Sequence, residues 1–147
     1  MSSTGAPRRR GADPTGPRAG SSATRPGDLG AAEVLGWVGA DIDDLLAIAP
    51  DTIGIQDVAD VLRGIDAQVN RLQAYSLAVT ASFDRRDGAK QVEARSTQDF
   101  LQRQLRRSPG QANDTLNTAR ALEEGHDATR EAMNQGRISP DHAREIV

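Results

Sequence analysis

The chain has no cysteine among its 147 residues. This absence excludes disulfides, thiolate metal sites and cysteine nucleophiles, and by default it favours an intracellular, cytoplasmic protein. Aromatic residues are also scarce, and Trp37, Tyr75, Phe83 and Phe100 are the full set. A core must therefore depend on Leu, Ile, Val and Ala, a composition that suits helices better than sheets.

Long apolar runs are absent as well. No stretch approaches the roughly eighteen apolar residues that indicate a membrane span. The basic start of the chain, RRRGADPTGPRAGSS, has no apolar segment behind it of the kind that a signal peptide needs. We therefore expect a soluble, cytoplasmic protein with no membrane partner.

Recognisable catalytic motifs are the third absence. The two histidines, His126 and His142, have no metal-ligand spacing around them. No glycine-rich phosphate loop follows a strand, and no nucleophile elbow occurs. The sequence predicts no catalytic residue, metal site, cofactor or small-molecule substrate, and so no enzyme activity for this chain.

Residues 1–30 are rich in Gly, Pro, Ser, Thr and Arg and contain almost no large apolar side chain. Such a segment cannot bury enough surface to offset the entropy of ordering, so we predict a disordered basic tail. It is either a solvated leader or a source of non-specific attraction to nucleic acid. Residues 31–147 are predicted to form an all-α domain that begins with an amphipathic helix over 31–49.

A heptad-like seam dominates the next segment. It predicts one long helix from about Gln56 to Arg86, with an a/d stripe interrupted only at Ser76. The stripe requires an apolar partner, which is either the helices that follow or the same helix of a second chain in a coiled-coil homodimer. Its residues are Val58, Leu62, Ile65, Val69, Leu72, Val79 and Phe83.

Two helix starts lie about a dozen residues apart in RSTQDFLQRQLRRSPGQANDTL (95–116). Ser96 with Asp99 resembles a capping box, and Ser108-Pro109 with Gln111 has the same pattern, with proline at the first helical position. A polar linker over 88–94 precedes the first helix, in which Phe100, Leu101 and Leu105 are expected to face inward. A turn of about three residues, 106–108, then gives helix-turn-helix spacing.

This pair of helices contains the only basic island of the predicted domain. Arg95, Arg103, Arg106 and Arg107 fall between 95 and 110 with a single acid, Asp99. In the second helix, Ala112, Leu116, Ala119 and Leu122 share one stripe, while Asn113 and Asn117 lie on the opposite face. We predict either weak DNA binding through the four arginines and two asparagines or a purely structural helical corner.

Two further short helices are expected, one over about 126–135 that ends at Gly136, and one capped by Ser139-Pro140. The last helix has little more than two turns and no C-terminal cap. We expect the chain to be truncated at its C-terminus relative to a longer protein.

The order of these segments resembles a known family. A heptad-like helix is followed by GAKQVEARSTQDFLQRQL, SPGQANDTLNTARAL and MNQGRISPDHAREIV, an arrangement similar to the domain of unknown function 222 over about 53–147. That domain is common in GC-rich actinobacterial genomes and usually precedes an HNH endonuclease module, whose His-Asn-His metal site is absent here. The Gly-x-Ile-Ser-x-x-His-Ala pattern at 136–143 is also similar to the helical DNA-binding core of ParB-type partition proteins.

The resemblance implies a non-catalytic DNA-binding or targeting domain associated with an HNH-type endonuclease or a mobile element. The alternative is a helical oligomerisation or protein-interaction module with no DNA affinity. Salt-dependent DNA binding would favour the first hypothesis, and concentration-dependent association would favour the second.

Overall fold

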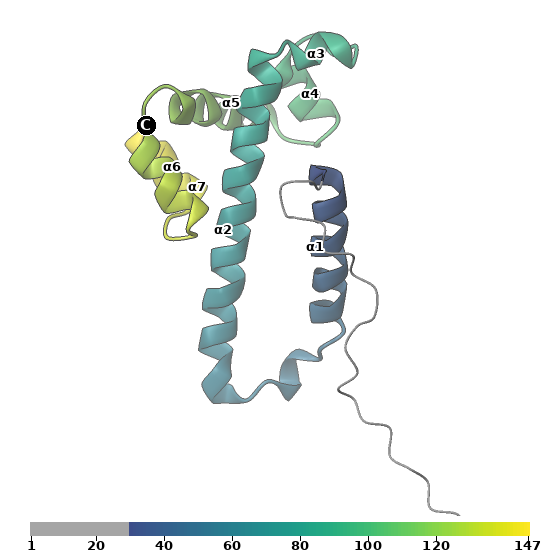
Figure 1. Cartoon of the computed structure of the whole chain (residues 1–147), viewed down its shortest axis with the longest axis vertical. Helices are drawn as coiled ribbons and strands as arrows, with labels where there is room; N and C mark the ends of the chain where they lie inside the picture. The colour runs from purple at the N-terminus through teal and green to yellow at the C-terminus, as the bar shows by residue number, and fades with distance from the viewer. Residues whose placement is uncertain (1–29) are drawn as a thin grey trace, which may run out of the picture. The chain divides into compact units, whose positions relative to one another are not determined.

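The computed structural model describes residues 30–147, and within them every regular element is a helix (Figure 1). The all-α prediction is confirmed. The elements are α1 (Ala31–Leu46), the 3-10 turn η1 (Pro50–Thr52), α2 (Ile55–Arg85), α3 (Gly88–Gln91), α4 (Thr97–Arg103), α5 (Pro109–Glu123), α6 (Asp127–Asn134) and α7 (Pro140–Ile146). Apart from Gly30, the predicted disordered tail lies outside the described residues.

The chain divides into two units, residues 1–52 and 53–147. In the first, α1 starts after Gly30 without a side-chain cap and buries none of its residues. Its apolar side chains follow helical spacing but remain exposed, as Trp37 is at 55%. Pro50 is the first residue of η1, a position where proline is tolerated because its missing N–H would have no partner within the helix.

In the second unit, α2 is the central helix, and the later helices pack against it. Its buried face consists of Asn70, Ala74, Leu77, Thr80 and Ala81. Small side chains on this face let α5 and α6 approach α2 closely. The main core joins Ala74, Leu77 and Ala81 to Ala119, Leu122, Met133 and Ala143, with Ile138 and Val147 partly buried against it.

The polar linker predicted for residues 88–94 is partly wrong. Residues 88–91 form the helical turn α3, and both Gly88 and Ala89 are buried. A Cβ at residue 88 would lie 2.3 Å from Cδ2 of Phe83, so this position requires glycine for a close approach that polarity alone does not reveal. The Phe83 ring also packs on Phe100, with 4.7 Å between centroids.

The helix starts at Ser96 and Ser108 are confirmed. The Ser96 hydroxyl accepts a hydrogen bond from the Asp99 backbone N–H at 3.0 Å. Ser108 and Gln111 form a complete capping box, in which the Gln111 N–H donates to Ser108 Oγ at 3.2 Å and the Ser108 N–H donates to Gln111 Oε1 at 3.0 Å. The stripe of Ala112, Leu116, Ala119 and Leu122 is buried, as predicted.

The turn between α4 and α5 is longer than predicted. Because α4 ends at Arg103, the turn comprises residues 104–108, and Arg106 takes a left-handed conformation with φ of 53°. Leu101 is buried with Ala112 and Leu116 in a second small core cluster. Leu105 falls beyond the end of the helix and is 50% exposed, so its predicted inward orientation is wrong.

The last two helices confirm both predicted boundaries. Gly136, two residues after the end of α6, has φ of 71°, and a Cβ there would lie 2.7 Å from the Ala67 carbonyl oxygen of α2. The Ser139 hydroxyl accepts a hydrogen bond from the His142 N–H at 3.3 Å. Ala143 in α7 and Met133 in α6 are fully buried. Of the helices described, none combines the length and apolar character needed to cross a bilayer.

Candidate functional site

The heptad seam and the core lie on different faces of α2. Residues 70, 74, 77 and 81 point into the second unit, whereas most of the a/d positions lie on another face of the helix. Five seam side chains, which we call the open seam, are 41–61% exposed. They are Leu62, Ile65, Val69, Leu72 and Val79. The helices of the second unit therefore do not cover this stripe.

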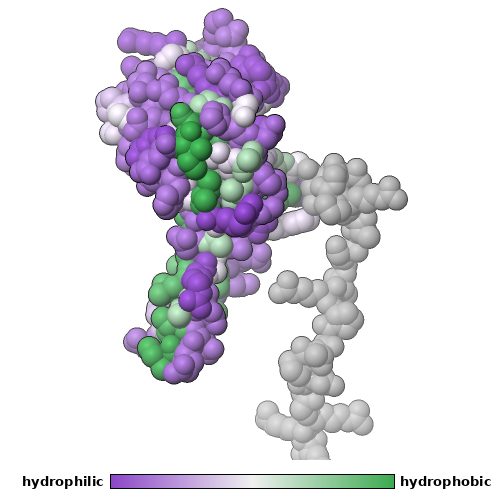
Figure 2. Space-filling model, turned by 90° about the vertical axis from the view of Figure 1, so that its left-hand side faces the viewer, coloured by the Kyte–Doolittle hydropathy of each residue, from purple (hydrophilic) through white to green (hydrophobic). Residues whose placement is uncertain are grey.

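The two ends and the interruption of the seam differ from the open seam. Val58 and Ser76 are partly buried, and so is Phe83, which Phe100 and Gly88 cover within the second unit. Figure 2 shows hydrophobic residues along the N-terminal half of α2 and a separate hydrophobic patch within the mainly hydrophilic surface above it. Most of the exposed large apolar side chains of the second unit lie on α2, and Val92, Leu105 and Ile146 are exposed elsewhere.

Few charges flank the open seam. Between residues 61 and 75 the e and g positions of the heptad carry Val61, Asp66, Gln68, Gln73 and Tyr75, so Asp66 is the one acidic residue among them and none is basic. In a coiled coil these flanking positions set partner choice through charge. Two identical helices would meet here with almost no opposed like charges.

The structure separates the four arginines of the basic island. Arg103 forms an ion pair with Asp99, with 2.7 Å between Nε and Oδ1. The Arg107 guanidinium donates a hydrogen bond to the Thr115 hydroxyl. Arg95 and Arg106 are exposed and form no ion pair with any described residue. Arg95 and Arg106 can therefore contact a phosphate backbone without breaking an ion pair within the chain.

Asn113 and Asn117 are both exposed on α5, opposite its buried stripe, as predicted. Acidic neighbours on the same helix are paired rather than free. Asp114 lies 3.2 Å from Arg144, and Glu123 pairs with Arg85. At the N-terminus of α5 the capping box occupies the N–H groups of Ser108 and Gln111, so fewer donors remain there than expected for a phosphate.

Asp84 connects three helices. Its carboxylate accepts a hydrogen bond from Arg120 Nε of α5 at 2.8 Å and from the Thr97 hydroxyl of α4 at 2.7 Å. The hydrogen bond from Arg120 is the main cause that lowers the pKa of Asp84, while burial opposes it and Thr97 adds to it. No local pattern in the sequence predicts this contact, because the partners are 13 and 36 residues apart.

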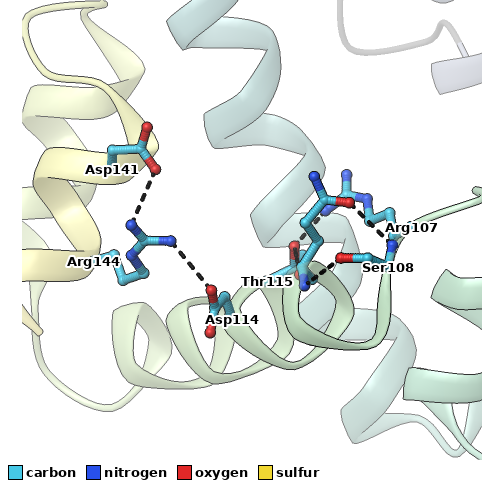
Figure 3. A network of polar contacts seen from close by, with 7 residues as sticks. Arg107, Ser108, Asp114, Thr115, Asp141 and Arg144 are labelled. Atoms are coloured by element: carbon cyan, nitrogen blue, oxygen red, sulfur yellow. Dashed lines mark hydrogen bonds and ion pairs between the residues drawn. The ribbon is translucent and has the colours of Figure 1, made fainter.

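A polar cleft of about 330 Å³ lies between α2, α5 and α7. Leu77 and Thr118 line it together with Arg107 and Gln111 at one end and the pair of Asp114 and Arg144 at the other. Figure 3 shows these two polar groups along α5, with Arg144 bridging Asp114 and Asp141. Sequence reasoning missed this cleft, although the polar residues at 111, 114, 115 and 118 share one face of a helix.

No group of three or more His, Asp or Glu side chains within residues 30–147 is arranged to hold a metal ion. The comparisons with known proteins bear on the same part of the chain. A family model described as Domain of unknown function (DUF222) matches residues 59–147. The chain belongs to this family. In this member of the domain of unknown function 222 family, the matched region includes most of α2 and all later helices. Neither the curated proteins nor the solved structures gave a significant match.

Proposed function

We propose that this domain is a helical self-association module whose contact surface is the open seam of α2. One observation carries the proposal. Five apolar side chains at a/d spacing are 41–61% exposed, while the same helix builds the core of its unit with a different face. An exposed apolar stripe of this kind is typical of an interaction surface.

The occupant that the chemistry favours is a second copy of the same helix. The seam is flanked mainly by apolar and uncharged polar residues, so two copies bring few like charges together. Burying the exposed halves of five apolar side chains on each copy is worth on the order of 10 kcal/mol. Association itself costs about 4–15 kcal/mol, so we expect a reversible dimer rather than an obligate one.

Cross-linking at a single introduced cysteine tests this proposal, since the chain has none of its own. Val69 lies near the middle of the seam, so the two cysteines of a Val69→Cys dimer would lie close together in either a parallel or an antiparallel pair. A short bis-maleimide should link this variant into dimers. Ala78→Cys is the matched control, because residue 78 is exposed on α2 away from the seam. Equal cross-linking of both variants would contradict the proposal.

A second candidate function is DNA targeting within a longer HNH-type endonuclease or mobile-element protein. It is supported by the exposed Arg95 and Arg106, which form no ion pair with a described residue, and by the exposed Asn113 and Asn117 of α5. Arginine is suited to phosphate contacts, and asparagine can pair with adenine in the major groove. With Arg103 and Arg107 engaged inside the chain, the binding surface is small, and we expect weak, salt-sensitive affinity.

A further inference from the structure

The cleft between α2, α5 and α7 has an unneutralised cation at one end. Arg107 is partly buried, and its guanidinium donates to the Thr115 hydroxyl, which in turn donates to the Gln111 carbonyl oxygen at 2.7 Å. The Arg107 backbone N–H also donates to the Leu101 carbonyl at 3.3 Å. These contacts fix the guanidinium in place, yet no described acidic side chain pairs with it.

The opposite end of the cleft has an excess of negative charge. Arg144 lies 3.2 Å from Asp114 and 3.5 Å from Asp141, so two carboxylates face one guanidinium (Figure 3). A dianion such as phosphate would meet one guanidinium that has no acidic partner, at Arg107, and be repelled by these acids. A ligand with a single negative charge suits the cleft better.

The floor of the cleft adds a second, independent observation. Thr118 is only 5% exposed and lines the cavity, and its hydroxyl has no hydrogen-bond partner among the described residues. No described side-chain oxygen that is closed to solvent lacks a partner, so this hydroxyl opens onto the cleft and is available to a ligand. Gln73 and Ser76 offer further polar groups on the α2 side, while Leu77 and Pro140 provide apolar surface.

We propose that this cleft binds a small organic molecule with one carboxylate and one amide or hydroxyl group. The carboxylate pairs with Arg107, and the neutral polar group bonds to Thr118 and the α2 side. Its volume of about 330 Å³ is near the lower end of the usual range for small-molecule sites. This site is separate from the open seam and does not depend on self-association.

Amide chemical shifts of the full chain, titrated with N-acetylglycine, test the proposal. N-acetylglycine carries one carboxylate and one amide, and N-acetylglycinamide is its uncharged counterpart. We expect saturable shifts at Thr115 and Thr118 with a millimolar Kd for the acid, and at least about tenfold weaker binding for the amide. Inorganic phosphate should bind no more tightly than the amide.

Three variants sharpen the test. Arg107→Gln should weaken binding of the acid by about tenfold, whereas Arg106→Gln, at the adjacent exposed arginine, should leave it unchanged. Thr118→Val keeps the shape of the side chain and removes its hydroxyl. It therefore tests whether this hydroxyl contributes to binding, even if the Arg107 variant unfolds. The proposal is overturned by an absence of saturable shifts, by equal shifts with the amide or phosphate, or by unchanged binding in Thr118→Val.

Discussion

Asp84 of α2 and Arg120 of α5 form an ion pair, with 2.8 Å between Oδ2 and Nε, at the point where Thr97 of α4 also donates to Asp84. Three helices therefore meet at one carboxylate. The Asp84 side chain is about one-fifth exposed, so solvent screens this pair less than it screens the ion pairs on the surface.

Replacing Asp84 by Asn should lower the free energy of unfolding by about 1 kcal/mol, because the ion pair with Arg120 is lost while Thr97 keeps an acceptor. Urea denaturation followed by circular dichroism measures this change. Asp60→Asn is the control, since its pair with Arg63 is highly exposed, and its effect should stay below about 0.5 kcal/mol. Equal effects of the two substitutions would show that the Asp84–Arg120 pair contributes no more to the free energy of unfolding than an exposed ion pair does.

The same residue predicts a pH dependence. The pKa of Asp84 is lowered from its ordinary value of 3.8, chiefly by the hydrogen bond from Arg120. Its stabilising contribution is therefore fully present above the unfolded-state pKa and is lost as the pH falls through the lowered folded-state value. The stability difference between wild type and Asp84→Asn should hold from pH 7 to pH 5 and shrink below pH 3.8. A difference that grows on acidification would contradict this assignment.

Gly136 should tolerate substitution poorly. Alanine there would have to adopt φ near 71° and place its Cβ 2.7 Å from the Ala67 carbonyl oxygen. We expect Gly136→Ala to lower the free energy of unfolding by about 2 kcal/mol or more. Gly64→Ala in α2, where nothing lies within 4 Å, should instead raise it by about 0.5–1 kcal/mol. Thermal or urea denaturation of both variants measures the contrast, and a neutral Gly136→Ala would refute the close packing of α6 against α2.

If the second candidate function holds, the double substitution Arg95→Glu/Arg106→Glu should abolish binding to duplex DNA. Two arginine–phosphate contacts give a slope of about −2 in log K against log salt. Fluorescence anisotropy at low and moderate salt measures affinity and slope, with Arg63→Glu on α2 as the control for net charge. A variant lacking residues 1–30 isolates the contribution of the basic tail. Unchanged affinity in the double variant, together with loss of affinity on removal of the tail, would refute a binding surface on α5.

We expect the chain by itself to leave DNA uncut. This prediction rests on the sequence motifs, which predict no catalytic residue or metal site, and metal-assisted hydrolysis needs a metal site. Supercoiled plasmid incubated with the purified chain and magnesium, manganese or zinc should stay supercoiled. Cleavage that persists through purification and disappears with chelator would contradict this expectation.

Local signals in the sequence predicted most of the helix boundaries. The caps at Ser96, Ser108 and Ser139 each act within three residues, so a single stretch of sequence contains both partners. Contacts across the fold were not predictable in this way. The longer α4–α5 turn depends on the left-handed Arg106, and the burial of Gly88 depends on the ring of Phe83.

For the candidate site, periodicity predicted which α2 residues form a stripe but not which face of α2 the core would use. The core uses the face with small residues such as Ala74 and Ala81, which carry a weak hydrophobic signal and allow close helix contacts. The polar cleft was not predicted, because Gln73, Arg107 and Arg144 are brought together only by packing of three helices. Composition alone marks these side chains as solvated.

Sedimentation equilibrium of the full chain across micromolar concentrations measures whether the open seam of α2 pairs two copies of the chain. The wild type should show a reversible monomer–dimer equilibrium, and Ile65→Lys/Leu72→Lys should be monomeric throughout, with an unchanged circular dichroism spectrum because both positions are exposed. A stably folded wild type that remains monomeric at every concentration would mean that the open seam is covered within one chain or stays solvated. That result would contradict self-association through the open seam of α2.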